Sequence, residues 1–397
     1  MIDLSYMDKL LDGVEVEGKE ISEIFHLKNG YTPSKSKTEF WENGDIPWFR
    51  MDDIRENGQI LNDSLQKVSM TAIKGGNLFP ADSIIMSTSA TIGEHALVTA
   101  PFLANQRFTN LSLKPAYFDR FKIKFIFYYC FLLADWCKDN TTMSSFASVD
   151  MNGFKKFQIP IPPLNIQAEI VRILDAFTEL TAELTAELTA RKQQYDYYRK
   201  QLFIFNESQI ELKLLGDVTV YEQPTKYRVD SKDYDDNFLT PVLTAGKTFI
   251  LGYTNEVEGI YEASKTPVII FDDFTTANKW VDFDFKVKSS AMKMVTSLDE
   301  SVVMQKFIYY WLNTLPSELV DGDHKRHWIS NFAKKEIPVP PLAEQQRIVT
   351  ILDKFDALTT SLTEGLPREI ELRQQQYEYY RELLLNFPKV EGNAYND

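Results

Sequence analysis

Three short runs of reactive side chains could do chemistry, but each one either has an ordinary structural interpretation or lacks a necessary residue. Asp282-x-Asp284-x-Lys286 has the residue types of a nuclease centre, but alternating Asp-Phe-Asp-Phe is equally typical of an amphipathic strand. Ala245-Gly-Lys-Thr248 ends like a phosphate-binding loop, but Pro241 stands where the first glycine belongs. His324 and His327 have no third metal ligand nearby, so we interpret His324-Lys-Arg-His327 as a basic segment that contacts phosphate.

Other catalytic signatures are missing from the sequence. It contains no Asn-Pro-Pro-aromatic or Asp-Pro-Pro-Tyr string of an amino-methyltransferase, and no G-x-G-x-x-G. Cys130 and Cys137 are seven residues apart on a predicted helix, which favours two buried thiols in a cytoplasmic protein over a zinc site. We therefore predict no catalytic, cofactor-binding or metal-binding residue in this chain.

The overall charge argues against general binding to nucleic acid. The 397 residues carry a net charge of −14, which a broad basic surface would not produce. The charge is uneven, however: residues 26–158 contain 15 Lys or Arg against 13 Asp or Glu, and residues 219–336 contain 14 against 18. Any DNA contact must come from local basic faces or from partners. The longest apolar run, 125–134, is about half of the ~20 residues that a membrane span needs, so we expect no membrane segment.

The strongest feature is a duplication. Ile159-Pro-Ile-Pro-Pro-Leu164 returns as Ile337-Pro-Val-Pro-Pro-Leu342, an offset of 178 residues (337 − 159), and the following helical patterns match as well. Lys124-Phe-Ile-Phe-Tyr-Tyr corresponds in the same way to Lys306-Phe-Ile-Tyr-Tyr-Trp at an offset of 182. Repetition on this scale predicts a pseudo-symmetric molecule that meets a two-part target.

Two globular segments separated by long helices must position any functional side chains. Short strand-like runs and turn signals in 16–158 and 210–336 predict an α+β fold for each segment. After each segment a proline cluster delays the start of a helix, and the helix from Leu164 to Phe203 would be about 60 Å long at ~1.5 Å per residue. Its apolar stripe matches that of its repeat, which predicts an antiparallel helix pair. Gly365 and Pro367 predict a kink in the second helix.

A four-residue unit recurs within the first long helix, as Thr181-Ala-Glu-Leu184 and Thr185-Ala-Glu-Leu188. It favours helix and would serve as a spacer. One unit adds ~6 Å and ~40° of rotation, which is close to the ~34–36° between successive base pairs of DNA. If the two globular segments lay along a DNA duplex, a change in the number of units would therefore rotate one relative to the other by nearly the angle between base pairs.

Together these motifs resemble those of the specificity subunits of type I restriction–modification enzymes. The resemblance covers nearly the whole chain and includes Gly30-Tyr-Thr-Pro-Ser34…Phe40-Trp41-x-x-Gly44-x-Ile-Pro-Trp48. It implies target recognition domains at 16–158 and 210–336, and conserved helical spacers at 159–209 and 337–397. Residues 1–15 would complete the second spacer, because Tyr6-Met-Asp-Lys-Leu-Leu11 resembles Tyr197-Tyr-Arg-Lys-Gln-Leu202.

The resemblance also implies the partners. Each recognition domain would read one half of a split double-stranded DNA target, and the helices would set the gap. Two methyltransferase subunits would bring S-adenosylmethionine and methylate adenine at N6, and ATP- and Mg-dependent restriction subunits would translocate and cleave DNA. The chain itself would be cytoplasmic and would hold no cofactor.

Base edges are read chiefly by Arg, Lys, Asn and Gln, with Ser and Thr as adaptable donors, and Lys or Arg on phosphates set the register. The candidate residues of the first domain are Thr32, Ser34, Lys35, Ser36, Lys37, Arg50, Ser87, Thr88, Ser89, Thr91, Gln106 and Arg107. Those of the second domain are Lys247, Thr248, Thr275, Thr276, Asn278, Lys279, Trp280, Lys325 and Arg326. We expect Phe40, Trp41, Pro47 and Trp48 to belong to the core.

Two alternatives stay open at this point. The chain could be a DNA-cleaving or DNA-methylating enzyme with unrecognised motifs. It could also be a coiled-coil adaptor with no DNA role. Catalysis by the purified chain would support the first alternative. A sequence preference that survives exchange of the globular domains would support the second.

Overall fold

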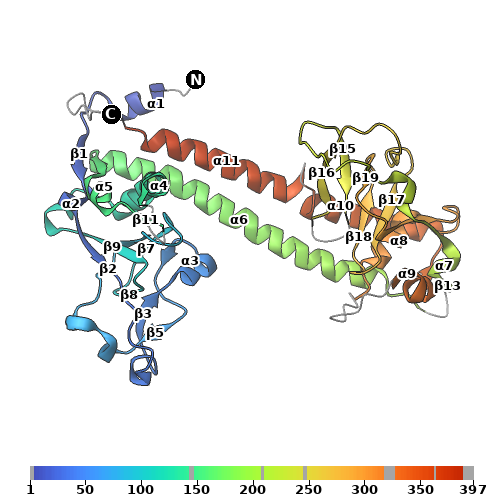
Figure 1. The fold of residues 1–397 in the computed structure, drawn as a ribbon, viewed down its shortest axis with the longest axis horizontal. Helices are drawn as coiled ribbons and strands as arrows, with labels where there is room; N and C mark the ends of the chain where they lie inside the picture. Colours follow the sequence, from blue (N-terminus) through green and yellow to red (C-terminus); the bar gives the residue numbers. More distant parts are fainter. Residues whose placement is uncertain are drawn as a thin grey trace. The chain divides into compact units, whose positions relative to one another are not determined.

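The two repeated segments fold into separate units in the computed structural model, which describes residues 4–142, 147–206, 210–244, 248–316, 327–361 and 364–387. The first unit contains Met1–Ala182 and Glu371–Asp397, and the second contains Glu183–Ile370 (Figure 1). Helix α6 (Leu164–Leu202) matches the predicted spacer helix to within one residue. The boundary between the units falls inside α6, in the Thr-Ala-Glu-Leu repeat.

The first unit is built on a five-stranded sheet, a three-stranded sheet and two small ribbons. The five-stranded sheet has the order β2(Phe25–Asn29), β9(Phe108–Leu113), β6(Ser83–Ser87), β7(His95–Val98), β4(Ile60–Leu61). The second has the order β5(Lys67–Val68), β3(Ile46–Phe49), β8(Leu103–Ala104), and the ribbons are β1(Glu17–Glu20) with β12(Gln158–Ile161) and β10(Thr141–Thr142) with β11(Ser148–Val149). The helices are α1(Leu4–Leu11), α2(Ile21–Ile24), α3(Met51–Asn57), α4(Ile123–Asp139) and α5(Met151–Lys156).

The second unit repeats this strand order, but its described residues have no counterpart of β4 and none of the β10–β11 ribbon. Its sheets have the orders β14(Thr219–Glu222), β20(Met292–Ser297), β17(Val268–Asp272), β18(Asn278–Val281) and β16(Ile250–Thr254), β15(Thr240–Leu243), β19(Lys286–Val287), with the ribbon β13(Glu211–Leu214)–β21(Glu336–Val339). Its helices are α7(Leu215–Val218), α8(Gln305–Leu312), α9(His327–Ser330) and α10(Leu342–Thr359), followed by α11(Gly365–Leu385), which continues into the first unit. The central strand of each three-stranded sheet makes one antiparallel and one parallel pairing, so the repeat extends to strand direction.

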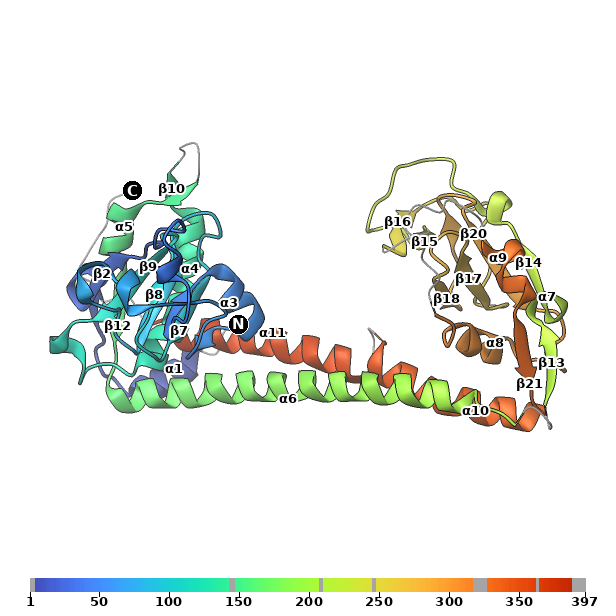
Figure 2. The same cartoon turned by 90° about the horizontal axis from the view of Figure 1, so that it is seen from below.

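Each large sheet is covered on both faces, which explains why every residue of its inner strand, β6 or β17, is buried. In β6, Ile84 and Met86 pack with α4, whereas Ile85 packs in a separate cluster on the other face. In β17, Ile269 and Phe271 pack with α8, whereas Ile270 packs on the opposite face. Both elements are labelled in Figure 2. Alternate side chains of a strand point to opposite faces, so one strand serves two cores.

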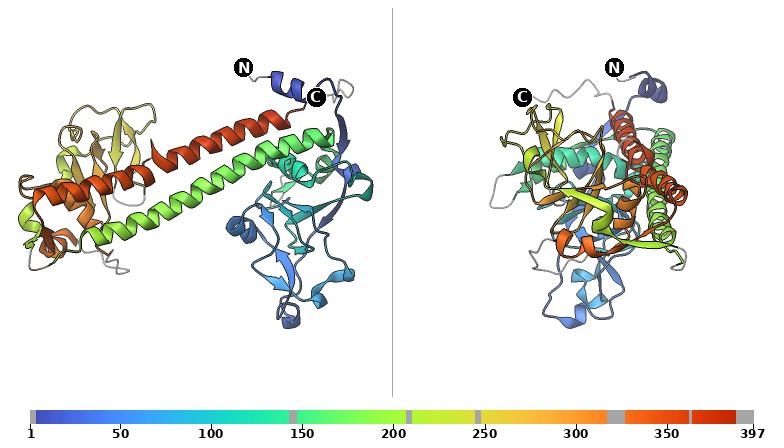
Figure 3. Two further views of the ribbon diagram at one scale, coloured as in Figure 1. Left: turned by 180° about the vertical axis from the view of Figure 1, so that it is seen from behind. Right: turned by 90° about the vertical axis from the view of Figure 1, so that its right-hand side faces the viewer.

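Within each unit the long helices pair through their apolar stripes. In the first unit, Ile170 and Leu174 of α6 share a cluster with Leu384 of α11 and with Met7 of α1. The courses of α6 and α11 can be followed in Figure 3. Phe177 stacks on Tyr380 with ring centroids 5.2 Å apart. In the second unit, Phe355 of α10 stacks on Tyr198 of α6 at 5.8 Å. These two contacts are equivalent under the repeat, and both pairs run antiparallel as predicted.

The second long helix breaks instead of kinking, which corrects the prediction at Gly365 and Pro367. Helix α10 ends at Thr359 and α11 begins at Gly365, whose φ is +76°. A Cβ on Gly365 would overlap the carbonyl oxygens of Ala357 and Leu358, so glycine permits this close approach. Pro367 lies in the first turn of α11, where its missing N–H costs no helical hydrogen bond. No helix in the described part of the chain is long and apolar enough to cross a membrane.

Candidate nucleic-acid interface

Backbone hydrogen bonds bring four polar segments of the first unit to one edge of its sheets. Strands β2, β3, β6 and β8 end at this edge, and β9 begins there. Tyr31 N donates to Ala104 O at 2.7 Å, Asn105 N donates to Phe49 O at 3.0 Å, and Thr88 N donates to Arg107 O at 3.0 Å. We call residues 30–37, Arg50, 88–91 and 105–107 the first edge.

The Gly-Tyr-Thr-Pro-Ser motif has a structural explanation. Gly30 lies so close to the backbone of Ala104 and Asn105 that a Cβ would overlap their carbonyl oxygens. The indole N–H groups of Trp48 and Trp41 each donate at 3.0 Å, to Tyr31 O and to Ser34 O. Trp48 is buried in a core cluster, as predicted, while Phe40 and Trp41 are partly buried against that cluster and Pro47 is partly exposed. The two tryptophans hold the loop that follows Gly30.

The first edge presents four basic side chains. Lys35, Lys37 and Arg107 are exposed. Arg50 is partly buried: its guanidinium carbon lies 5.7 Å from the Trp48 ring centroid, and its backbone N donates to buried Asp53 Oδ2 at 2.6 Å. Thr32 Oγ1 donates to exposed Gln106 Oε1 at 2.5 Å, which links the motif loop to segment 105–107. This arrangement offers phosphate-binding cations beside adaptable donors and acceptors.

Two predicted contacts in this domain are wrong. Ser87 is fully buried, and its Oγ donates to Ser89 O at 3.0 Å. Thr88 is 9% exposed, and its Oγ1 lies 3.0 Å from Thr109 Oγ1. The Ser87 hydroxyl therefore holds the β6–β7 hairpin and the Thr88 hydroxyl joins the end of β6 to β9, whereas Ser89 and Thr91 in the hairpin loop are partly exposed.

The predicted residues of the second domain divide into three groups. Lys247, Lys325 and Arg326 lie outside the described residues, and Thr248 is exposed. Thr275 and Thr276 lie in the β17–β18 turn, where Asp272 N donates to Ala277 O at 2.8 Å, much as Ser87 N donates to Glu94 O at 2.7 Å in the first unit. Thr276 is 6% exposed, and Thr275 Oγ1 donates to Asp272 Oδ2 at 2.6 Å, so both shape the turn.

Asn278 and Trp280 are directed to a different face from the one predicted. They lie on β18, where Asn278 Oδ1 accepts from Asn313 Nδ2 at 3.0 Å and Trp280 packs on Tyr309 of α8. Lys279, which lies between them, is exposed. The structure therefore assigns Asn278 and Trp280 to the contact with α8.

The structural repeat identifies residues that sequence patterns missed. Val229 N donates to Val287 O at 3.0 Å, in the place of the Tyr31–Ala104 bond, and Lys288 N donates to Leu243 O at 2.9 Å, in the place of the Asn105–Phe49 bond. We call residues 228–232, 273–277 and 288–291 the second edge. It adds Arg228, Lys232, Lys288 and Ser289 as candidates, and the only signal for them in the sequence was their position after matching strands.

The three residues of the nuclease-like pattern, Asp282, Asp284 and Lys286, each bond to a different structural partner and do not form one site. Asp282 accepts from Trp280 Nε1 at 3.2 Å, and Asp284 accepts from Ser264 Oγ at 2.6 Å. Lys286 is buried and pairs with Glu256 at 2.5 Å. The run is also not one regular strand, contrary to expectation, because residues 282–284 connect β18 to β19, Phe285 forms an isolated bridge with Tyr261, and only Lys286 lies in a strand, β19.

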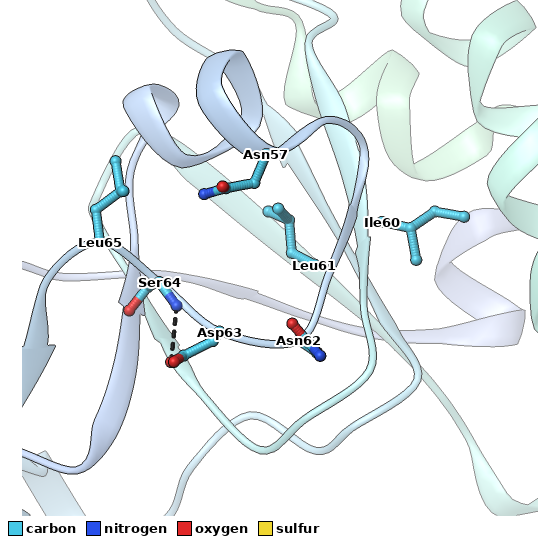
Figure 4. Close-up of a pocket in the computed structure, with 7 residues that line it drawn as sticks. All are labelled: Asn57, Ile60, Leu61, Asn62, Asp63, Ser64 and Leu65. Atoms are coloured by element: carbon cyan, nitrogen blue, oxygen red, sulfur yellow. Dashed lines mark hydrogen bonds between the residues drawn. The ribbon is translucent and has the colours of Figure 1, made fainter. Parts of the chain in front are cut away.

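A hollow of about 300 Å³ lies beside β4 in the first unit, lined by Asn57 and residues 60–65 (Figure 4). Its carboxylate, Asp63, accepts from Ser64 N at 2.9 Å and pairs with Lys67 Nζ at 2.8 Å, which lowers the pKa of Asp63. Within the described ranges no three His, Cys, Asp or Glu side chains are grouped to hold a metal ion. The hollow offers neither a nucleophile with its base nor a pair of carboxylates.

Comparison with known proteins gives consistent results. A family model described as the type I restriction modification DNA specificity domain matches residues 13–191 and again 207–372. The chain is 46% identical over 402 residues to the specificity subunit of the Escherichia coli type I restriction enzyme EcoprrI, covering 92% of this chain and 93% of that protein. It is 63% identical over 190 residues, 46% of each chain, to the EcoR124I/EcoR124II specificity subunit of Escherichia coli. The solved S subunit of a type I restriction–modification system from M. genitalium has a similar fold, with a TM-score of 0.56 and 15% identity over 95% of this chain and 98% of that one.

Proposed function

The chain belongs to the family of type I restriction–modification DNA specificity subunits, and from this premise we propose that its two edges each read one half of a split DNA target. The chain is the specificity subunit of such a system and is not itself an enzyme. The observation that carries the proposal is that the same edge is built twice, by strands of the same order and direction. A reader duplicated within one chain fits a target with two half-sites.

Catalysis then belongs to partner subunits. Methyltransferase subunits would supply S-adenosylmethionine chemistry, and restriction subunits would supply ATP-driven translocation and cleavage. The sequence supports this division, because it lacks methyltransferase and nucleotide-binding motifs. The net charge of −14 supports it too, because a subunit that only chooses the sequence can leave most phosphate neutralisation to its partners.

Helix α6 would set the gap between the half-sites. Its 39 residues correspond to about 58 Å at ~1.5 Å per residue. The Thr-Ala-Glu-Leu units lie where α6 passes from one unit to the other, so their number determines how far along the helix the second domain begins.

The deciding experiment is to map methylated adenines in cells that carry the chain with the methyltransferase of its own system. We expect one bipartite motif with a fixed gap. Replacing residues 16–158 by the matching domain of a relative should change one half of the motif and leave the other half and the gap unchanged. The reciprocal exchange of 210–336 is the control.

Two results would overturn the proposal. One is a single exchange that rewrites both halves. The other is cleavage or methylation of duplex DNA by the purified chain alone with Mg²⁺ and S-adenosylmethionine, which would revive the enzyme alternative.

A further inference from the structure

A partly buried polar contact joins each globular segment to its own long helix, and it occurs twice. In the first unit, Asp175 of α6 accepts from Tyr128 Oη through Oδ1 at 2.7 Å and from Lys124 Nζ through Oδ2 at 2.7 Å. In the second unit, Asp353 of α10 accepts from Tyr310 Oη at 2.5 Å and pairs with Lys306 Nζ at 2.9 Å. We call Lys124, Tyr128 and Asp175 the first clamp, and Lys306, Tyr310 and Asp353 the second clamp.

A fully buried glutamine reinforces each clamp at the start of the same helix. Gln167 Oε1 accepts from Lys122 N at 2.8 Å, and its Nε2 donates to Arg120 O and Pro162 O at 2.8 and 2.7 Å. Gln345 does the same with Met304 N, Val302 O and Pro340 O, at 2.8, 2.9 and 2.8 Å. Every donor and acceptor of these contacts has its counterpart in the other unit.

These contacts do something that the apolar stripes cannot do. Isoleucine and leucine side chains hold two surfaces together without fixing a direction, whereas hydrogen bonds to a carboxylate select one angle and distance. Tyrosine hydroxyls are protonated at neutral pH, and burial and the neighbouring carboxylate raise the pKa of both clamp tyrosines further, so the hydroxyls donate over a wider pH range. Each globular segment is therefore held in one orientation about the axis of its helix.

We propose that the two clamps are positioning devices that fix the orientation of each recognition domain on its own helix, and thereby restrict the assembled complex to one gap length. This inference rests on the proposed function. Successive base pairs differ by ~34–36° around the DNA axis, so a domain free to rotate by that angle could read a half-site one base pair away. The clamps touch no DNA and act through the orientation of the edges.

The test uses the full chain with its methyltransferase partner and records the gap length at every methylated site. The variants are Tyr128→Phe, Tyr310→Phe and the double variant, which remove one hydroxyl from each clamp and keep the ring. The matched controls are Tyr129→Phe, one residue along α4 in a ring cluster with Phe125 and Phe157, and Tyr309→Phe, which packs on Trp280.

We expect sites with a gap one base pair too long or too short to gain methylation about tenfold in each single variant, equivalent to about 1.4 kcal/mol of lost selectivity. The double variant should show a larger gain. The bases read in both half-sites should stay the same, and the controls should behave like the unaltered chain. A purely structural role would lower methylation at all sites together and leave the gap distribution unchanged.

An unchanged gap distribution at normal methylation, or a change in the bases read, overturns the inference. If a variant abolishes methylation, hydrogen exchange on the purified complex shows whether the variant has loosened only the clamp or has destabilised the whole chain. Faster exchange confined to residues 123–139 and 164–178, or to their counterparts 305–312 and 342–356, supports the clamp, and faster exchange throughout the chain refutes it. Failure of the proposed function is distinguishable, because the unaltered complex would then show no bipartite motif.

Discussion

At the scale of single residues, Gly30 shows most clearly why the Gly-Tyr-Thr-Pro-Ser motif requires its glycine. Any Cβ at this position meets two backbone carbonyl oxygens, and backbone cannot move aside as a flexible side chain can. We expect Gly30→Ala to destabilise the first unit by about 1–3 kcal/mol and to weaken recognition of the first half-site only. Thermal unfolding and adenine methylation mapping measure the two effects.

Gly18→Ala is the matched control, because its Cβ would make only an ordinary 3.4 Å contact with Gln158. The explanation of the motif fails if Gly30→Ala behaves like Gly18→Ala in both measurements.

His95 makes the first unit sensitive to acid. Its ring is buried against Phe127 and Phe131, with Nδ1 3.1 Å from Gly93 O, and burial lowers its pKa to about 4. An unfolded chain has an ordinary histidine pKa of ~6.5, so it binds the proton first and stability falls as pH drops from ~6.5 to about 4.

The loss attributable to His95 should reach about 3 kcal/mol near pH 4, at ~1.36 kcal/mol per pKa unit. We expect His95→Gln to be less stable than the unaltered chain at pH 8 and to lose less stability between pH 7 and 5. Urea denaturation at several pH values, followed by hydrogen exchange in β7, measures the difference. If the stabilities of the two proteins fell in parallel as pH drops, His95 would not be the source of the acid sensitivity.

At the scale of elements, α6 is a continuous helix through the repeated four-residue units, whereas the second spacer breaks between Thr359 and Gly365. The second copy has four more residues between matching aromatic residues, Phe355 to Tyr377 against Phe177 to Tyr195, and the break lies within this interval. The two spacers therefore differ in the connection, while the stacked contacts at their ends are equivalent.

Deleting Thr185–Leu188 should shorten the preferred gap by about one to two base pairs, because one unit corresponds to ~6 Å and ~40° of helix. Methylation mapping gives the gap directly. Replacing the same four residues by Ala-Ala-Glu-Leu keeps the length and should leave the gap unchanged. If the deletion instead alters the bases read, α6 is not the ruler.

At the scale of the whole molecule, the net charge of −14 should limit DNA binding by the chain alone. We expect weak binding by the isolated chain, and much tighter binding with a steeper salt dependence once methyltransferase subunits join and neutralise further phosphates. Fluorescence anisotropy at several salt concentrations measures how the DNA affinity of the chain, alone and with its partner, depends on salt concentration. Equal salt dependence with and without the partner would contradict the proposal that partner subunits neutralise most of the phosphates.

The sequence was sufficient for the duplication, the two α+β segments and the long spacer helix, because repeated motifs and 3.6-residue periodicity are local in the chain. It also correctly assigned Trp48 of the first-domain motif to the core, against which Phe40 and Trp41 are only partly buried. Tertiary structure decided which polar residues reach the edges: it buried Ser87 and Thr88, directed Trp280 to α8, and brought Lys288 to a position equivalent to Asn105. Only the tertiary structure revealed the clamps as well, since Tyr128 and Asp175 are 47 residues apart and meet only when α4 packs on α6. The physical reason is that residue type determines what a side chain can bond, while the packing of distant elements determines what it meets.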